Sequence, residues 1–247
     1  MITIKSKSEM DAMRRAGAIV AMVLDTLEKE VRPGIATERL DDIAEEMIRS
    51  KKALPAFKGY QGFPATICTS VNDEVVHGIP GKRTLREGDI IGIDVGVRWD
   101  GFFGDAARTL PVGEVGPAVQ RLIDVTREAL RRGIIQAVRN NRISDISHAV
   151  QTYVESQRYG VVRQYVGHGI GSKLHEEPQV PNFGDPGQGP SIRSGMALAI
   201  EPMVTEGSHE VKLADDGWTV LTRDHGLSAH FEHTVLVTEN GTEILTG

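Results

Sequence analysis

The sequence predicts an α+β fold in which one order of elements, two helices followed by strands, occurs twice. The chain has 247 residues and is 40% hydrophobic, so it can fill the core of one large domain or of two merged halves. Helical periodicity of the apolar residues returns in the second half in the same order as in the first. The strand-like segments of the two halves can also be aligned residue by residue. These observations favour an internal duplication.

The first half begins with two predicted helices. The first follows Ser8, which has Asp11 three residues later as in a capping box, and it stops near Pro33 and Gly34. The second begins near Thr37. Apolar residues fall on one face of each helix. These residues are Met13, Ala16, Val20, Val23, Leu24, Leu27 and Val31 in the first helix, and Leu40, Ile43, Ala44, Met47 and Ile48 in the second.

The second half repeats this pair of helices. Its first helix carries Val119, Leu122, Ile123, Thr126, Leu130 and Ile134, and its second follows Ser144 and carries Ile146, Ala149, Val150, Tyr153 and Val154. Both sets have helical spacing. We therefore expect a single domain of residues 1–247 with internal halves of about 8–112 and 117–243.

The strand-like segments of the two halves carry acids at matching positions. Segment 85–94 aligns with segment 192–201 in apolar pattern and in the position of one glycine, and each segment ends in an acid. The strand that follows begins with an acid in both halves. The acids related in this way are Asp94 with Glu201 and Asp105 with Glu232.

A hairpin is expected to bring the first two acids together. If Asp100 and Gly101 form a two-residue turn, Asp94 lies opposite Ala107. Asp105 then shares a face with Asp94 and is its diagonal neighbour, roughly 7–8 Å away. Both carboxylates can reach an ion that lies between them.

Four acids within apolar strands need a partner, because burying a carboxylate is costly unless it is paired or binds a metal. Together with a neutral His168, which lies between two glycines, they carry four negative charges, which two divalent cations cancel. Oxygen ligands with one imidazole suit manganese, iron, cobalt or zinc. Paired ions, roughly 3.5–4 Å apart, lower the pKa of a bound water and polarise a carbonyl, which is hydrolytic chemistry.

Composition excludes several other classes of function. The formal charge of −6 gives no basic excess for general nucleic-acid binding. Cys68 is the only cysteine, so no intrachain disulfide can form. The polar N-terminus does not resemble a signal peptide, and no apolar run approaches the roughly 20 residues that span a bilayer. A cytoplasmic location and a monomer are the expectations.

Each residue also has a structural interpretation. A single acid is more often a turn residue or a solvated group, and His77 and His175 can be hydrogen-bonded structural histidines. His230 shares the predicted strand face of Glu232, so a role in the site and a structural role both remain open. Trp218 fits a hairpin aromatic or a pocket wall.

Seven segments give the sequence a family resemblance. It resembles the type I methionine aminopeptidases, subfamily A of metallopeptidase family M24, over nearly its whole length. The resemblance implies the pita-bread (creatinase/aminopeptidase) fold, with two pseudo-symmetric αβ halves around a dinuclear metal site. The segments are 71–80 (VNDEVVHGIP), 92–96 (GIDVG), 104–109 (GDAART), 167–171 (GHGIG), 175–180 (HEEPQV), 199–203 (AIEPM) and 232–235 (EHTV).

The resemblance also implies roles for individual residues, and removal of the initiator methionine from nascent chains with a small second residue. Asp105 and Glu232 would bridge two ions, Asp94 would bind one, and His168 with Glu201 the other. Glu201 would be the general base, His175 would stabilise the oxyanion, and His77 would bind the substrate backbone. The methionine pocket would be lined by Tyr60, Phe63, Cys68, Leu174 and Trp218.

Three positions depart from the family pattern. Phe63 stands where tyrosine is common, Leu174 where phenylalanine is common, and His230 where glutamine is common. None of these is an implied metal ligand or proton-transfer residue. We expect changed inhibitor fit or rate, and unchanged chemistry.

Two rival functions and one further partner are weighed beside this. Prolidase and aminopeptidase P share the ligand set but usually carry an added N-terminal domain, and some relatives with the fold are binding proteins that have lost ligands. The basic stretch Arg49, Lys51 and Lys52, with Lys58, suggests docking at the ribosome near the exit tunnel, although such clusters are usually solvated faces.

Overall fold

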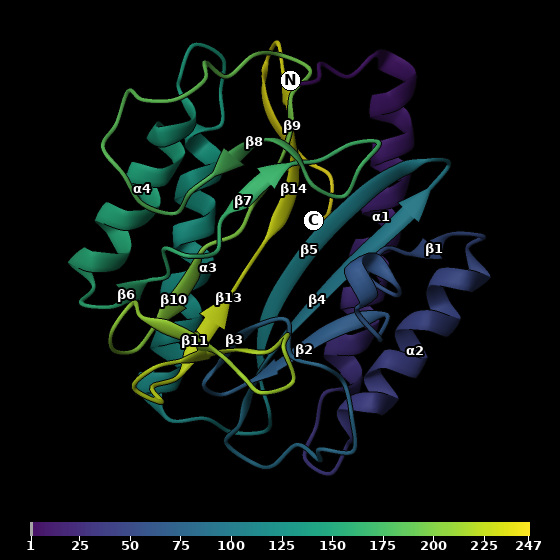
Figure 1. The fold of residues 1–247 in the computed structure, drawn as a ribbon, viewed down its shortest axis with the longest axis vertical. Coiled ribbons are helices and arrows are strands. Elements are labelled where there is room, and N and C mark those ends of the chain that lie inside the picture. The colour runs from purple at the N-terminus through teal and green to yellow at the C-terminus, as the bar shows by residue number, and fades with distance from the viewer. Residues whose placement is uncertain (1) are drawn as a thin grey trace.

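The computed structural model describes residues 2–247 (Figure 1), and it confirms the α+β class. Two helix pairs alternate with strands. The helices are α1 (Lys7–Glu30), α2 (Thr37–Ser50), α3 (Pro117–Gln136) and α4 (Ile143–Ser156), with the 3₁₀ turn η1 (Tyr60–Gly62). The strands are β1 (Leu54–Pro55), β2 (Ile67–Val71), β3 (Glu74–Val76), β4 (Ile90–Trp99), β5 (Phe102–Pro111), β6 (Gly160–Val161), β7 (Gly167–Gly169), β8 (Glu176–Val180), β9 (Ala197–Ile200), β10 (Met203–Thr205), β11 (Val211–Leu213), β12 (Val220–Thr222), β13 (Ser228–His230), β14 (His233–Thr238) and β15 (Gly241–Ile244).

The start of α1 differs from the sequence prediction. The capping box is formed by Ser6 and Glu9, not by Ser8 and Asp11. The Ser6 hydroxyl accepts the backbone N–H of Glu9, and the Glu9 carboxylate accepts the backbone N–H of Ser6 at 2.7 Å. The same Ser-x-x-acid spacing occurs two residues earlier than predicted, and Ser6 has the extended backbone that an N-cap requires, whereas Ser8 is already helical.

The predicted hairpin is confirmed in the first half. β4 and β5 pair antiparallel, with Asp94 opposite Ala107. Asp100 and Gly101 make the turn with φ of 47° and 85°, and positive φ at both positions is the requirement of a type I′ turn. The long helix α1 packs against this sheet, as Figure 1 shows.

The second half builds a five-stranded sheet in the order β15-β14-β9-β7-β8. β9 ends at Ile200, one residue before Glu201, and pairs with β7 through His168 opposite Ala199. Helices α3 and α4 lie beside these strands, on the side of the molecule away from α1 and α2 (Figure 1). Their buried residues, among them Ile123 and Val150, join Leu198 in one core.

Backbone hydrogen bonds join the two halves at the middle of the molecule. The N–H of Glu232 donates to the carbonyl of Ala107 at 2.9 Å, and the N–H of Ala107 donates to the carbonyl of Glu232 at 3.3 Å. The Thr234 hydroxyl donates to the Asp105 carbonyl and accepts from the Asp105 N–H, at 2.8 and 3.0 Å. Two acids that are 127 positions apart in the sequence, Asp105 on β5 and Glu232 just before β14, are therefore held side by side.

Of the helices described for residues 2–247, none combines the length and the apolar composition needed to cross a membrane.

Candidate metal centre and active site

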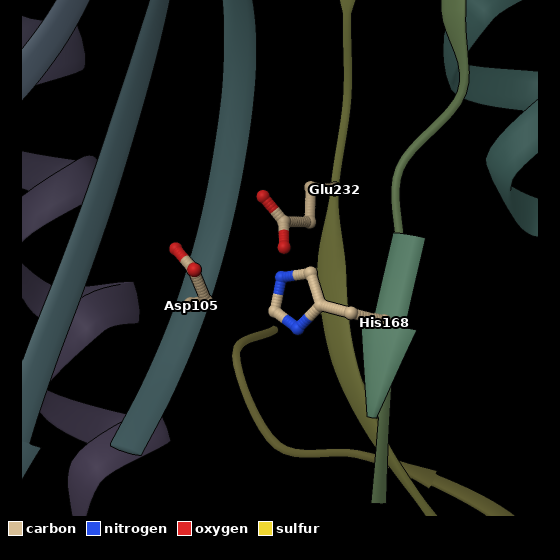
Figure 2. Close-up of side chains that lie close together, drawn as sticks. All are labelled: Asp105, His168 and Glu232. Atoms are coloured by element: carbon tan, nitrogen blue, oxygen red, sulfur yellow. The ribbon is translucent and has the colours of Figure 1, made fainter. Parts of the chain in front are cut away.

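Three side chains from both halves converge at the junction. Asp105 comes from β5, His168 from β7, and Glu232 from the segment between β13 and β14. One potential ligand atom from each lies within 4.8 Å of the others, and Figure 2 shows the Glu232 carboxylate beside the His168 ring, with Asp105 on the neighbouring strand. All three are buried, with exposed fractions of 4%, 8% and 2%. Asp94 and Glu201 line the same cavity.

The carboxylates of this group lack the hydrogen bonds that buried oxygens normally make. Asp94 Oδ1, Asp105 Oδ1 and Glu232 Oε1 are buried without a hydrogen-bond partner in the described part of the chain. Unpartnered buried anions are costly, and a bound cation removes that cost. The donor set of four carboxylates and one imidazole thus fits divalent metal ions.

The electrostatics of the group point the same way. Burial raises the pKa of Asp105 well above its usual value, and the neighbouring Glu232 and Asp94 raise it further. Burial also raises the pKa of Glu201 and of Glu232, again with repulsion from nearby carboxylates. Folding brings these carboxylates together against their mutual repulsion. Positive charge placed among their oxygens would lower their pKa values again.

His168 is oriented as a ligand. Its Nδ1 lies 2.9 Å from the carbonyl oxygen of Gly169, so Nδ1 carries the proton and donates. Nε2 then presents its lone pair to the cavity, 3.6 Å from Glu201 Oε1. Burial, with His175 nearby, lowers the pKa of His168 to about 3, so the ring is neutral at physiological pH. A neutral imidazole held by a backbone carbonyl is the usual form of a metal-binding histidine.

A cavity of about 210 Å³ adjoins these side chains. It brings together every residue that the sequence analysis placed in the site, and it includes two that the analysis missed, Phe57 and Gln61. Both lie in the segment between β1 and β2, where the sequence offers no periodic pattern. The lining residues are Phe57, Tyr60, Gln61, Phe63, Cys68, His77, Asp94, Asp105, His168, Leu174, His175, Glu201, Trp218 and Glu232.

One wall of the cavity is apolar. The rings of Phe63 and Trp218 meet edge to face with centroids 5.1 Å apart, and Leu174 packs in the same cluster. Cys68 lies on β2 opposite Asp94. Burial and the nearby acids, Asp94 first, raise the pKa of the Cys68 thiol, so it remains a neutral, polarizable surface. This wall suits a flexible apolar side chain with a sulfur atom.

Two further histidines, His77 and His175, line the same cavity. The Tyr60 hydroxyl lies 2.8 Å from His175 Nδ1, and the rings of His175 and His168 stack edge to face at 4.2 Å. His77 follows β3 with φ of 62°, a left-handed conformation that turns the chain sharply beside the cavity. Burial, with His175 nearby, lowers the pKa of His77 to about 4. Neutral imidazoles at this place can donate hydrogen bonds to a substrate.

A buried ion pair supports the loop that carries Leu174 and His175. Lys5 Nζ donates to Glu176 Oε2 at 2.7 Å, and the two side chains are only 4% and 7% exposed. Glu176 Oε1 also accepts the backbone N–H of Lys173 at 3.1 Å. The sequence analysis missed this pair, because no local pattern links residues that are 171 positions apart.

Comparisons with known proteins find a consistent set of similarities. The model of metallopeptidase family M24 matches residues 11–239. A methionine aminopeptidase of Clostridium acetobutylicum is 54% identical over 100% of this chain and 99% of its own length. Methionine aminopeptidase 1 of Bacillus subtilis is 52% identical over the same shares of the two chains.

Solved structures agree with these relatives. The crystal structure of a methionine aminopeptidase from Thermotoga maritima superposes with a TM-score of 0.98 at 48% identity, covering 100% of this chain and 99% of that one. The enzyme from Rickettsia prowazekii gives 0.99 at 44% identity, with both chains covered completely. A prolidase from Pyrococcus furiosus, at 21% identity and a TM-score of 0.82, shares the fold and covers 99% of this chain and 65% of its own.

Proposed function

The chain belongs to the methionine aminopeptidases of metallopeptidase family M24, and we propose that it removes N-terminal methionine with two divalent ions held at the junction of its halves. The similarity to solved structures confirms the pita-bread fold that the sequence predicted. The observation that carries the two-ion proposal is the set of buried carboxylates with unpartnered oxygens beside an apolar cavity. We assign residues 8–112 and 117–243 as the two halves of one catalytic domain.

The proposed ligand set divides between the ions. Asp105 and Glu232 lie at the centre of the group and would bridge both ions. Asp94, beside Asp105, would complete one site, and His168 with Glu201 would complete the other. When bound, manganese, iron, cobalt or zinc ions would lower the pKa of a water molecule and polarise the scissile carbonyl.

The chain's own residues then have separate tasks. Glu201 takes a proton from the attacking water and gives it to the leaving amine. His175 donates a hydrogen bond from Nε2 to the developing oxyanion, because Nδ1 faces the Tyr60 hydroxyl. His77 binds the substrate backbone beside the scissile amide.

The cavity supports specificity for methionine. Tyr60, Phe63, Cys68, Leu174 and Trp218 form an apolar lining that suits a thioether side chain. Beyond the scissile bond, the substrate passes the rings of His77 and His175. We propose that this crowding limits the second residue of the substrate to small side chains.

The substrates in the cell would be nascent polypeptides, and we place the monomeric enzyme in the cytoplasm. Docking at the ribosome near the exit tunnel extends the proposal. Arg49 and Lys58 both pair with Glu45, at 2.7 and 2.6 Å, so one carboxylate offsets part of the charge of this basic stretch. Cosedimentation with ribosomes that persists after all four basic residues are changed to serine would exclude this contact.

A peptide assay tests the proposed function. Chelator-treated protein should release no methionine from Met-Ala-Ser, and added manganese or cobalt should restore release. Met-Leu-Ser should remain uncleaved because its second residue is large. The variant Asp105→Ala should be inactive with every metal, and full activity in this variant would refute the mechanism. Cleavage of dipeptides that end in proline, with Met-Ala-Ser left intact, would indicate a prolidase instead.

A further inference from the structure

One buried histidine beside the metal centre has no partner for its side chain. His230 is 4% exposed, and its Nε2 makes no hydrogen bond with any described residue. In contrast, the backbone N–H and the backbone carbonyl of His230 are both hydrogen-bonded to the side chain of Thr109. The His230 N–H donates to Thr109 Oγ1 at 2.8 Å, and the Thr109 hydroxyl donates to the His230 carbonyl at 2.9 Å. The ring is therefore held in place by an anchored backbone while its nitrogen stays unpaired.

The unpaired nitrogen faces two of the carboxylates. His230 Nε2 lies 4.0 Å from Glu201 Oε2 and 4.0 Å from Glu232 Oε2. The other oxygen of Glu201, Oε1, lies 3.6 Å from His168 Nε2. The Glu201 carboxylate thus stands between two imidazoles, with one oxygen directed to each.

His230 has two possible roles, a structural one in the core and one in the metal centre. A separation of 4.0 Å exceeds a hydrogen bond, but a movement of about 1 Å brings an N–H and a carboxylate oxygen into range. A purely structural residue at this depth would be better served by an apolar side chain, which leaves no nitrogen unpaired. The imidazole is therefore placed for the carboxylates and not for the core.

We propose that His230 is a positioning residue of the metal centre, whose Nε2–H donates to Glu201 Oε2, with Glu232 Oε2 as a second acceptor. The inference rests on the proposed two-ion site. The donated hydrogen bond fixes the orientation of the Glu201 carboxylate, so that Oε1 stays beside His168 Nε2, where the two residues would hold an ion. Residues that orient ligands in this way typically contribute about 10- to 100-fold to metal affinity or activity.

Metal titration of chelated protein tests the proposal without measuring catalysis. Calorimetric titration with Co²⁺ or Mn²⁺ should show that His230→Leu binds about 10- to 100-fold more weakly than wild type. His230→Gln should retain the wild-type affinity, because its amide keeps an N–H donor. His233→Leu is the matched control: His233 lies three residues further along, at the start of β14, and its Nδ1 is hydrogen-bonded to Thr246 Oγ1 at 2.9 Å. This variant should bind metal as the wild type does.

Three results would contradict the expectation, each in a different way. Wild-type affinity in folded His230→Leu protein would overturn the positioning role. A loss in His230→Gln as large as in His230→Leu would show that the nitrogen itself ligates an ion, which also overturns it. Absence of metal binding in the wild type would overturn the proposed function from which the inference starts. Circular dichroism of each variant establishes that it is folded before titration.

Discussion

Changing Asp94 to asparagine should make the metal-free protein more stable and should reduce the stabilisation that added metal gives. Asp94 lies on β4 with Oδ1 buried and unpartnered. Burial raises the pKa of this carboxyl group from 3.8 to about 7. The folded protein therefore favours the protonated form of Asp94, and the cost of ionising it appears as lost stability.

The sign of the pH dependence follows from the raised pKa. The contribution of Asp94 to stability is fully present below its unfolded pKa of 3.8 and is lost as the pH rises through the folded value of about 7. At pH 8 the ionised side chain costs at most about 4 kcal/mol. Asparagine carries no charge at any of these pH values, so Asp94→Asn avoids this loss. At pH 5 the stability difference between Asp94→Asn and the wild type should be less than half of its value at pH 8.

Bound ions should reduce the stability advantage of Asp94→Asn over the wild type. A ligand that binds only the folded state stabilises it by about 2.7 kcal/mol at a free concentration 100 times its Kd. Asparagine is a weaker ligand than a carboxylate, so Asp94→Asn should gain less from added Mn²⁺ than the wild type gains.

Urea unfolding measures the free energy of unfolding of both proteins at pH 5 and at pH 8, each with chelator and with Mn²⁺. Asp42→Asn, which changes an exposed aspartate on α2, is the control for the loss of one charge and should change stability little in each condition. The reasoning fails if chelated Asp94→Asn protein is no more stable than the wild type at pH 8.

Three further substitutions probe the residues around the metal centre. Lys5→Met leaves Glu176 buried without its cation and should lower the free energy of unfolding by about 3 kcal/mol, measured by urea unfolding; an unchanged midpoint would show that the pair is dispensable. Leu174→Ala removes apolar contact from the methionine pocket and should reduce kcat/KM on Met-Ala-Ser by about 10- to 200-fold, while metal affinity by calorimetry stays constant. His175→Ala should reduce kcat by about 10²- to 10³-fold with both metals retained, and loss of metal in this variant would contradict an oxyanion role.

Local patterns predicted the fold because they survive into the tertiary structure. The apolar face around Leu40 and Ile48 becomes the buried face of α2, and the Asp100 and Gly101 turn sets the β4–β5 register. Two helix starts were misplaced: α4 begins at Ile143 and not after Ser144, and α1 begins after Ser6, where two capping-box spacings overlap. The Ser6–Glu9 and Ser8–Asp11 pairs have the same spacing, so the spacing alone does not show which pair forms the capping box. The hydrogen bonds between Ser6 and Glu9 do.

Non-local contacts could not be predicted in this way. The ion pair of Lys5 with Glu176 depends on the final position of a segment that precedes α1. Phe57 and Gln61 enter the cavity from an irregular segment in which Gln61 has φ of 50°, a conformation that no periodicity signals. The sequence could not predict that His230 faces Glu201. A shared strand face indicates the side of the sheet on which a side chain lies, but not which residue it meets there.

The placement of the site residues explains which of them can differ from the family pattern. Asp105 lies within a strand whose backbone is bonded across the junction to Thr234, so its carboxylate has little freedom and replacing it would remove a buried ligand. Leu174 and Phe63, in contrast, lie outside the strands, in the buried apolar cluster that lines the cavity. A change in their size alters the shape of the pocket without moving a ligand, because the ligands are fixed by strand pairing on either side. Substrate fit and metal binding should therefore vary independently in this protein.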